Sequence, residues 1–496
     1  MNRLHLRGSL VVVVLSLLNV CSLNSQQIGG LCSGISSNSV EQLSPPPAAP
    51  SLMPPAPTPL LTPPLPRLAA SCGLTPDELL PAWAREFEPS TEIYVSPSGN
   101  DHNNGRSPST ALRTAAAAVS KLGPGVRLNF ATGTYSCSGL LIRNLKGGTE
   151  KPASIRSSDG PYLARFDCAG SGGILFNFVQ GFIVEGIELF NSSSHGIQIM
   201  SGGGPWPNST VLSSDIVVHH SFMHNNRYAG IKSSQSQNLT FIDNEFSYVP
   251  ASHMAIEAVA VDDVIVAGNY EHDSNGYFDE IKGGANGGII FHNLVLDSKR
   301  GIIAGGDETG YQYLVHTKAT YEVQNLQVWD NVIANVNEEA FRIVGCTNCD
   351  IVNNTYYSNS PTRIQAVIRF LSDAFVDKAG YIIRHIYNAN VHLNNNIFFT
   401  PDKFNYMIAK SPAQDAKQLI MSHNLFWWAA GGIVGSDVPY LREPTSLYVD
   451  PDLTSPPANM HPLSASPVIN KGQLSNVSTD NWDGVCWSGN PNMGAY

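Results

Sequence analysis

Val264-Ile-Val-Ala-Gly-Asn269-Tyr and Ile289-Ile-Phe-His-Asn293-Leu-Val are two copies of a short phrase that recurs between Ile216 and Phe426. Each copy contains a few β-forming residues, an Asn or small polar anchor and another apolar residue. A turn follows, and then Gly-Ile, Ala-Ile or a close variant. The anchors of the successive copies are Ser221, Asn244, Asn269, Asn293, Asn331, Asn354, Asn396 and Asn424. The first four steps between anchors are 23, 25, 24 and 38 residues.

A repeat in the twenties, made of strand-forming runs without helical periodicity, is typical of a stacked solenoid. The recurring Asn has a physical reason, because each coil must turn a corner where backbone groups lose their ladder partners. A side-chain amide stacked on the next amide satisfies such groups, and Asn tolerates the left-handed conformation that corners use. The sequence therefore predicts an all-β fold, a single-stranded parallel β-helix, which we expect to be a monomer.

The composition agrees with a solenoid and restricts the partners. Of the 496 residues only 14% are charged, while 43 are Gly, which suits buried strands and tight corners. The formal net charge of -11 argues against nucleic acid or an anionic membrane as the main partner. It still allows an acidic sugar that meets a local basic patch or a bound cation.

The amino-terminal part is predicted to lie outside the fold. Residues 1–25 read as a secretory signal peptide, because Arg3 and Arg7 precede an apolar run from Leu10 to Val20. Residues 26–88 are predicted to be a Pro-rich linker, since eleven of the 33 prolines lie between Ser44 and Arg67. The β-helix is predicted over 89–440 and a closing segment over 441–496. We expect a secreted, extracellular protein that is not held in a membrane.

Sequons and cysteines support export. Asn-x-Ser/Thr sequons occur at Asn191, Asn208, Asn238, Asn353 and Asn476, so a glycoprotein is expected. In an oxidising compartment we expect a Cys137–Cys168 disulfide, because one coil separates the two residues. A small corner disulfide is expected for Cys346-Thr-Asn-Cys349, since no second pair is spaced for zinc.

The two ends of the predicted β-helix resemble a known family. Ile93-Tyr-Val-Ser-Pro-Ser-Gly-Asn-Asp and Gly125-Val-Arg-Leu-Asn-Phe-Ala-Thr-Gly-Thr-Tyr135 are similar to the start of secreted right-handed parallel β-helix proteins of the pectate-lyase-like superfamily. Leu463-Ser-Ala-Ser-Pro-Val-Ile-Asn-Lys-Gly472 resembles their closing segment. The Ala-rich stretch from Thr110 to Leu122 independently predicts a short helix, which we interpret as the cap of the first coil.

Charged residues follow the Gly-Ile and Ala-Ile phrases. In successive coils these segments read Gly230-Ile231-Lys232, Ala255-Ile256-Glu257, Glu280-Ile281-Lys282, Gly301-Ile302-Ile303 and Ala340-Phe341-Arg342. If each Ile or Phe points inward, the next residue points outward, and coils stack about 4.8 Å apart. Lys232, Glu257 and Lys282 are then expected to form one outward column. A charge ladder on an exposed face is the plainer interpretation of such a column.

The resemblance also implies a chemistry. Asp279-Glu-Ile-Lys282-Gly looks like the lysine-bearing coil of the chondroitinase B and alginate lyase group, which implies Lys282 as catalytic base. Arg300, at the next turn, and Glu257, in the outward column, are the other candidate catalytic residues. Lys232, Arg342, Tyr311 and Tyr313 are candidate substrate-binding residues, the tyrosines on an insertion that we expect to wall the site. Ca²⁺ is the expected cofactor, with Asp262, Asp263, Asp279 and Glu280 as candidate ligands.

Other chemistries fit less well. The Gly-His-Gly and Arg-Ile-Lys motifs of pectin hydrolases and the Asp-Pro-His motif of mannuronan epimerases are absent. His219, His220, His292 and His423 lie beside the Asn anchors, and we interpret them as corner residues and not as ligands. The expected function is a secreted polysaccharide lyase that cleaves a uronic-acid-containing polymer by β-elimination. The alternative is a non-catalytic glycan-binding or cell-surface β-helix protein.

Overall fold

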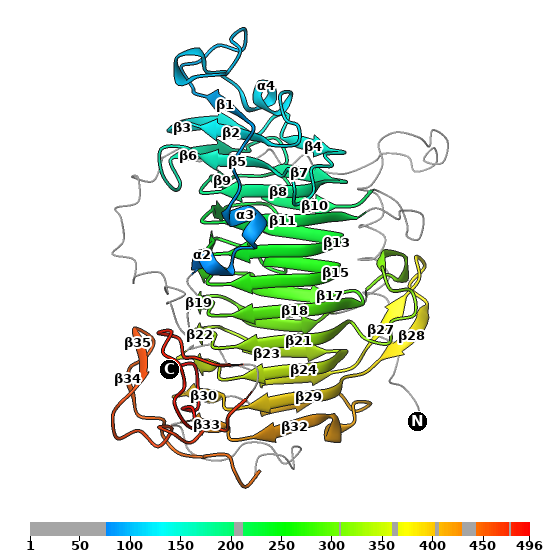
Figure 1. The fold of residues 1–496 in the computed structure, drawn as a ribbon. Helices are drawn as coiled ribbons and strands as arrows, with labels where there is room; N and C mark the ends of the chain where they lie inside the picture. Colours follow the sequence, from blue (N-terminus) through cyan, green and yellow to red (C-terminus); the bar gives the residue numbers. More distant parts are fainter. Residues whose placement is uncertain are drawn as a thin grey trace, which may run out of the picture. The chain divides into compact units, whose positions relative to one another are not determined.

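The computed structural model describes residues 76–202, 212–306, 309–359, 366–401, 406–428, 443–475 and 478–496. Parallel strands stack along one axis as a β-helix, so the expected all-β solenoid is confirmed (Figure 1). The strand pairings form three ladders, which we call faces 1, 2 and 3. The predicted signal peptide and most of the predicted linker lie outside the described residues. No helix in the described part of the chain is long and apolar enough to cross a membrane.

Face 1 carries the strands that begin with the Gly-Ile and Ala-Ile phrases. Its strands are β4 (Leu141–Arg143), β7 (Ile174–Asn177), β10 (Ile197–Met200), β13 (Ile231–Ile242), β15 (Met254–Ala267), β17 (Tyr277–Lys282), β20 (Arg300–Gly305), β23 (Phe341–Val344), β26 (Ala366–Leu371) and β31 (Tyr406–Lys410).

Face 2 shares the long strands β13 and β15 with face 1. Its other strands are β1 (Thr91–Val95), β2 (Val126–Phe130), β5 (Ala153–Ser157), β8 (Gln180–Glu185), β11 (Ser213–His219), β18 (Ala285–Phe291), β21 (Val323–Trp329), β24 (Cys346–Val352), β29 (Ala389–Asn394) and β32 (Leu419–Ser422).

Face 3 is built from short strands that directly follow the anchor residues. Its strands are β3 (Gly133–Ser136), β6 (Ala164–Asp167), β9 (Glu188–Phe190), β12 (Phe222–His224), β14 (Glu245–Ser247), β16 (Tyr270–His272), β19 (Leu294–Leu296), β22 (Val332–Ala334), β25 (Thr355–Tyr357), β30 (Ile397–Thr400) and β33 (Leu425–Trp428).

A few elements lie outside the three faces. Strands β27 (Asp373–Val376) and β28 (Ile382–Ile386) form an antiparallel hairpin, as do β34 (Leu453–Ser455) and β35 (Asn459–Pro462). The helices are α2 (Pro76–Leu79), α3 (Ala82–Arg85) and α4 (Ala115–Val119), with 3-10 turns η1 (Pro108–Thr110), η2 (Tyr311–Tyr313) and η3 (Ala416–Gln418).

The Asn anchors form a buried ladder at the corner between faces 2 and 3, as predicted. Asn293 donates from Nδ2 to the Val266 carbonyl at 3.0 Å and to Asn331 Oδ1 at 2.9 Å. Its own Oδ1 accepts from the backbone N–H and the Nδ2 of Asn269. The same pattern continues through Asn354, Asn396 and Asn424. The ladder therefore satisfies backbone groups of one coil with the side chain of the next.

One detail of the corner differs from the prediction. The left-handed conformation belongs to the residue before each ladder Asn, as in His292 with φ 52°, Asp330 with φ 51° and Asn353 with φ 56°. The ladder Asn itself keeps an ordinary φ, since its side chain must reach back across the stack. Asn353 is also a predicted glycosylation site, but its buried amide donates to the Gly494 carbonyl, which removes it from solvent.

The predicted capping helix and both predicted disulfides are present in the structure. Helix α4 is shorter than the stretch from Thr110 to Leu122, and it places Ala115 and Ala118 in the core at the amino-terminal end of the solenoid (Figure 1). The expected pairs Cys137–Cys168 and Cys346–Cys349 are both disulfide-bonded.

Two outer surfaces of the solenoid are covered by the chain itself. Leu80 and Phe87, with half-buried Trp83, pack on apolar side chains that point outward from face 2, so the predicted linker range of 26–88 is too long. Trp482, Met493 and other residues of the closing segment cover the apolar outer side of face 3.

The core holds one carboxylic acid on an inward position of face 3. Glu271 lies in register between Phe246 and Val295, and it is fully buried. Burial raises the pKa of Glu271 to about 8. The folded chain therefore holds a proton at this site through a pH range in which the unfolded chain has lost it.

Replacing a ladder residue is expected to destabilise the fold. Asn293→Ala leaves the Asn269 N–H buried without its partner, at about 1–3 kcal/mol, and it also removes one hydrogen bond from the Val266 carbonyl. Asn286→Ala is the control, because its half-exposed side chain bonds only to side-chain amides, and a loss below about 1 kcal/mol is expected. Urea unfolding measures both variants, and equal losses would contradict the ladder's role.

The stability of the wild type is expected to fall as the pH rises from about 5 to 8, because Glu271 has a raised folded-state pKa. Its contribution is complete below the unfolded-state pKa and is lost towards pH 8, with a slope approaching about 1.4 kcal/mol per pH unit. Glu271→Gln removes this part of the slope. Urea unfolding at pH 5, 6.5 and 8 compares the two chains, and parallel pH profiles would show that Glu271 is ionised in the folded state.

Candidate functional site

The outer side of face 1 carries a row of charged residues. Strand pairing places Lys232 beside Glu257 and Glu257 beside Glu280, all pointing outward. The row continues through Ile303, Arg342 and Arg369. We use the name charged row for the following residues: Lys232, Glu257, Glu280, Ile303, Arg342 and Arg369, together with Lys282, Arg300, Glu338 and Glu339.

The predicted position of Lys282 is wrong by two residues. Lys282 pairs with Val259, and Glu280 takes the place beside Glu257. The inward position next to Ile256 belongs to Asp279 and not to Ile281. Lys282 nevertheless points outward on the same face, because two steps along a strand restore the side-chain direction.

Each lysine of the charged row is held by a carboxylate. Lys232 forms an ion pair with Glu257, and Lys282 Nζ lies 2.9 Å from Glu280 Oε2. The lysine side chains retain 18% and 17% exposure. The backbone of Gly306 lies directly over Lys282, where a Cβ would come within 2.2 Å of Lys282 Cδ. Only glycine therefore lets the chain pass so close above this lysine.

Three arginines converge on one buried carboxylate. Glu339 is 1% exposed and pairs with Arg300, with Arg342 at 3.3 Å and with Arg369 at 2.5 Å. Burial raises the pKa of Glu339, but Arg300, Arg342 and Arg369 together lower it further, so the net shift is downward. Arg300 also pairs with Glu338 and lies over the Tyr277 ring. Arg300 is in register with Tyr277, five positions before Lys282, so the structure does not bring the two predicted catalytic residues together.

The pKa values of the two lysines are shifted in opposite directions. Burial lowers the pKa of Lys232 by more than the ion pair with Glu257 raises it, and the nearby Lys282 lowers it a little further. Burial also lowers the pKa of Lys282, but Glu280 and Glu257 outweigh it and the net shift is upward. Lys282 is therefore the more firmly charged of the two. Lys232 is closer to the neutral form that a base requires.

The rim of face 1 contains aromatic and imidazole rings that the sequence analysis missed. The ring of Tyr228 lies 5.3 Å from that of His195 and 5.0 Å from that of His253. Burial lowers the pKa of His195 to about 4, with Lys232 contributing, so the imidazole is neutral at pH 7. The sequence does indicate the position of these rings, because Tyr228 and His253 stand directly before the Ala-Gly-Ile and Met-Ala-Ile segments that begin strands of face 1.

The predicted insertion lies beside the charged row. The backbone carbonyl of Tyr313 accepts a hydrogen bond from Gln235 at 3.2 Å, and Tyr313 is 52% exposed. Tyr311 packs with Phe375 and Ile386 of the β27–β28 hairpin. The insertion and the hairpin therefore support one another, and Tyr313 remains available to solvent.

The four predicted calcium ligands are not brought together. Asp279 points into the core and Glu280 points outward. Asp262 lies at the start of face 2 with His316 Nε2 at 2.9 Å, and the neighbouring Asp263 is exposed. Burial raises the pKa of Asp279 well above its usual range, so this acid is protonated. The residues present do not fit a calcium site of this composition.

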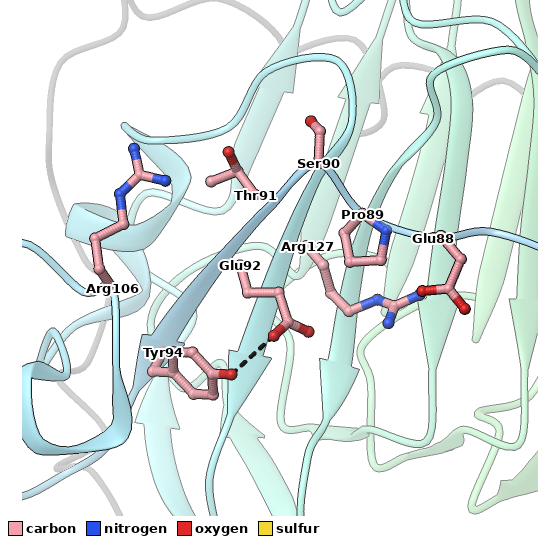
Figure 2. Close-up of a pocket in the computed structure, with 8 residues that line it drawn as sticks. All are labelled: Glu88, Pro89, Ser90, Thr91, Glu92, Tyr94, Arg106 and Arg127. Carbon is pink, nitrogen blue, oxygen red and sulfur yellow. Dashed lines mark hydrogen bonds between the residues drawn. The ribbon is translucent and has the colours of Figure 1, made fainter.

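Two pockets lie elsewhere on the solenoid. One, of 420 Å³, is lined by Glu88, Glu92, Arg106 and Arg127 near β1, where Tyr94 donates to Glu92 (Figure 2). A second, of 620 Å³, lies beside Trp83 on the outer side of face 2. Neither of these two pockets includes a residue of the charged row.

Comparisons with known proteins address the fold. The family model described as "Right handed beta helix region" matches residues 135–250 and 167–318. The chain is a right-handed parallel β-helix protein. A comparison with curated proteins finds no match.

Several solved structures resemble this β-helix. The pectate lyase Pel9A is 16% identical, with 83% of this chain and 97% of that chain covered and a TM-score of 0.45. The A-module of a mannuronan C-5 epimerase from Azotobacter vinelandii is 12% identical, with 68% and 94% covered and a TM-score of 0.45. A PL6-family polysaccharide lyase from Pseudopedobacter saltans is 14% identical, with 70% and 96% covered and a TM-score of 0.39.

Proposed function

We propose that this β-helix is an exported, carbohydrate-active protein that binds a uronic-acid-containing polysaccharide along the outer side of face 1 and cleaves it by β-elimination. The observation that carries the proposal is the charged row. Five cations, Lys232, Lys282, Arg300, Arg342 and Arg369, gather on one face of a chain whose net charge is -11. Such a concentration favours a polyanion in extended contact with the sheet.

The shape of the surface supports an extended ligand. Apolar parts of the outer sides of faces 2 and 3 are covered by the chain's own segments, whereas the outer side of face 1 keeps polar, partly exposed groups. Tyr228 and His253 along the rim offer rings against which sugars stack. The side chain of Tyr313 offers a further ring on the neighbouring insertion.

Lys232 is a better candidate for the base than Lys282. In β-elimination a base removes the proton beside the carboxylate, a carbon–carbon double bond forms, and the bond to the departing sugar oxygen breaks. The base must be partly neutral, and the pKa of Lys232 is shifted in that direction by burial. Lys282 and Arg342 remain cations, and their role is to neutralise the substrate carboxylate, which makes the neighbouring proton more acidic.

The proposal includes a dependence on calcium and export from the cell, and each is measured separately. Because the expected acidic ligands are separated, no step is routed through Ca²⁺, and activity with calcium is compared with activity in chelator. Export is tested by the amino-terminal sequence of the protein that a secreting host releases, which we expect to begin near Ser22 to Ser25.

The proposed reaction is tested by a screen of pectate, alginate and glycosaminoglycans for unsaturated-uronide absorbance. With the substrate that reacts, Lys232→Gln is expected to lower kcat by about 10²–10⁴-fold. Lys282→Gln is expected to raise KM more than it lowers kcat, because it removes substrate binding. Lys121→Gln is the control, since Lys121 is exposed and follows the capping helix.

Three outcomes would revise the proposal. Retained kcat in Lys232→Gln with kcat lost in Lys282→Gln would return the base to Lys282. Binding without any product, from all three polymer classes, would support the non-catalytic glycan-binding alternative. The absence of both binding and product would contradict a polysaccharide ligand on face 1.

A further inference from the structure

A second cluster of chemically reactive side chains lies far from the charged row, at the corner between faces 2 and 3. One ligand-type atom from each of His292, Asp330 and Asp480 lies within 4.8 Å of the other two, and all three residues are buried. Among the described residues it is the one group of three His, Cys, Asp or Glu side chains with this spacing. His292 Nε2 lies 3.7 Å from Asp330 Oδ2.

The hydrogen bonding of His292 in this cluster is incomplete. The His292 side chain is 3% exposed, yet neither of its ring nitrogens has a hydrogen-bond partner. The Ser478 hydroxyl lies 3.0 Å from Asp330 Oδ2, and it also lies close to the other oxygen of that carboxylate. A buried imidazole without partners costs about 1–3 kcal/mol for each unsatisfied group. Two buried carboxylates side by side also require a positive charge or a proton.

A divalent cation would satisfy all of these groups at once. It would accept a lone pair from His292, balance the two carboxylates and occupy the space that the 3.7 Å separation leaves between imidazole and carboxylate. An imidazole ligand with carboxylates is a donor set that zinc accepts, whereas calcium prefers oxygen ligands alone.

We propose that His292, Asp330 and Asp480 form a structural site for a zinc-class divalent cation, with the Ser478 hydroxyl beside it. The proposal is independent of any activity on face 1. It also replaces the interpretation of His292 as a plain corner residue.

The position of the site indicates what the ion does. His292 comes from the corner between β18 and β19, and Asp330 comes from the corner between β21 and β22 one coil later. Asp480 belongs to the closing segment that covers the outer side of face 3 (Figure 1). The ion therefore joins two coils to the segment that shields their apolar surface. Metal affinity is coupled to docking of that segment.

The test uses the full chain after removal of metal with EDTA. Titration with zinc is expected to give one ion per chain and a higher Tm, because the ion binds the folded state alone. His292→Asn, which tolerates the left-handed corner, is expected to weaken zinc binding by at least about 100-fold and to abolish the rise in Tm. Asp480→Asn is nearly isosteric and is expected to have the same effect.

The matched control is His423→Asn, an equivalent substitution at a corner residue with φ 52°. It is expected to keep full zinc binding. The proposal is wrong if the metal-free wild type takes up no zinc, or if His292→Asn and Asp480→Asn bind it as tightly as the control. Uptake of calcium in place of zinc would contradict the assignment of the metal class. If His292→Asn does not fold, zinc binding by Asp480→Asn alone tests the proposal.

Discussion

The stacked Asn ladder at the corner between faces 2 and 3 is the constraint on which the rest of the molecule depends. Between its two ends, each ladder amide donates to a strand carbonyl and to the next amide, and it accepts the backbone N–H of the preceding anchor, as Asn293 does with Val266, Asn331 and Asn269. Slipping one coil by a residue would leave these buried groups without partners. The ladder therefore fixes the register of every coil that it joins, and with it the residues that face outward.

The outward residues differ on the three faces, and this difference assigns their roles. Residues 79–87 and the closing segment cover apolar parts of the outer sides of faces 2 and 3. Face 3 also carries outward ion pairs, such as Arg165 with Glu188. Face 1 exposes ion pairs and aromatic rings. The charged row holds five cations and four carboxylates, and on this excess we base the proposal of a polyanionic ligand.

The fold could be predicted from the sequence because its signal is local and repeated. The Asn spacing, the Ala-rich cap and the spacing of Cys137 and Cys168 each reflect one coil of chain. The register of the charged row could not be predicted from the sequence, because the corner before β17 places Asp279 at an inward position where apolar residues are expected. The apolar pattern of the sequence aligns Ile281 with Ile256, which displaces Lys282 by two residues from its position in the structure. The proposed site at His292 needs Asp480, which is distant in sequence and adjacent only after the closing segment folds back.

The central claim, that the register places Glu280 and not Lys282 beside Glu257, is tested most directly by engineered disulfides. Neighbouring outward positions on parallel strands lie about 4.8 Å apart, within the range that a disulfide spans, whereas a two-residue offset gives about 8 Å. We expect Glu257→Cys with Glu280→Cys to cross-link under mild oxidation, as shown by mapping of non-reduced peptides. A cross-link that forms instead between Glu257→Cys and Lys282→Cys would contradict the register and the proposed roles of both lysines.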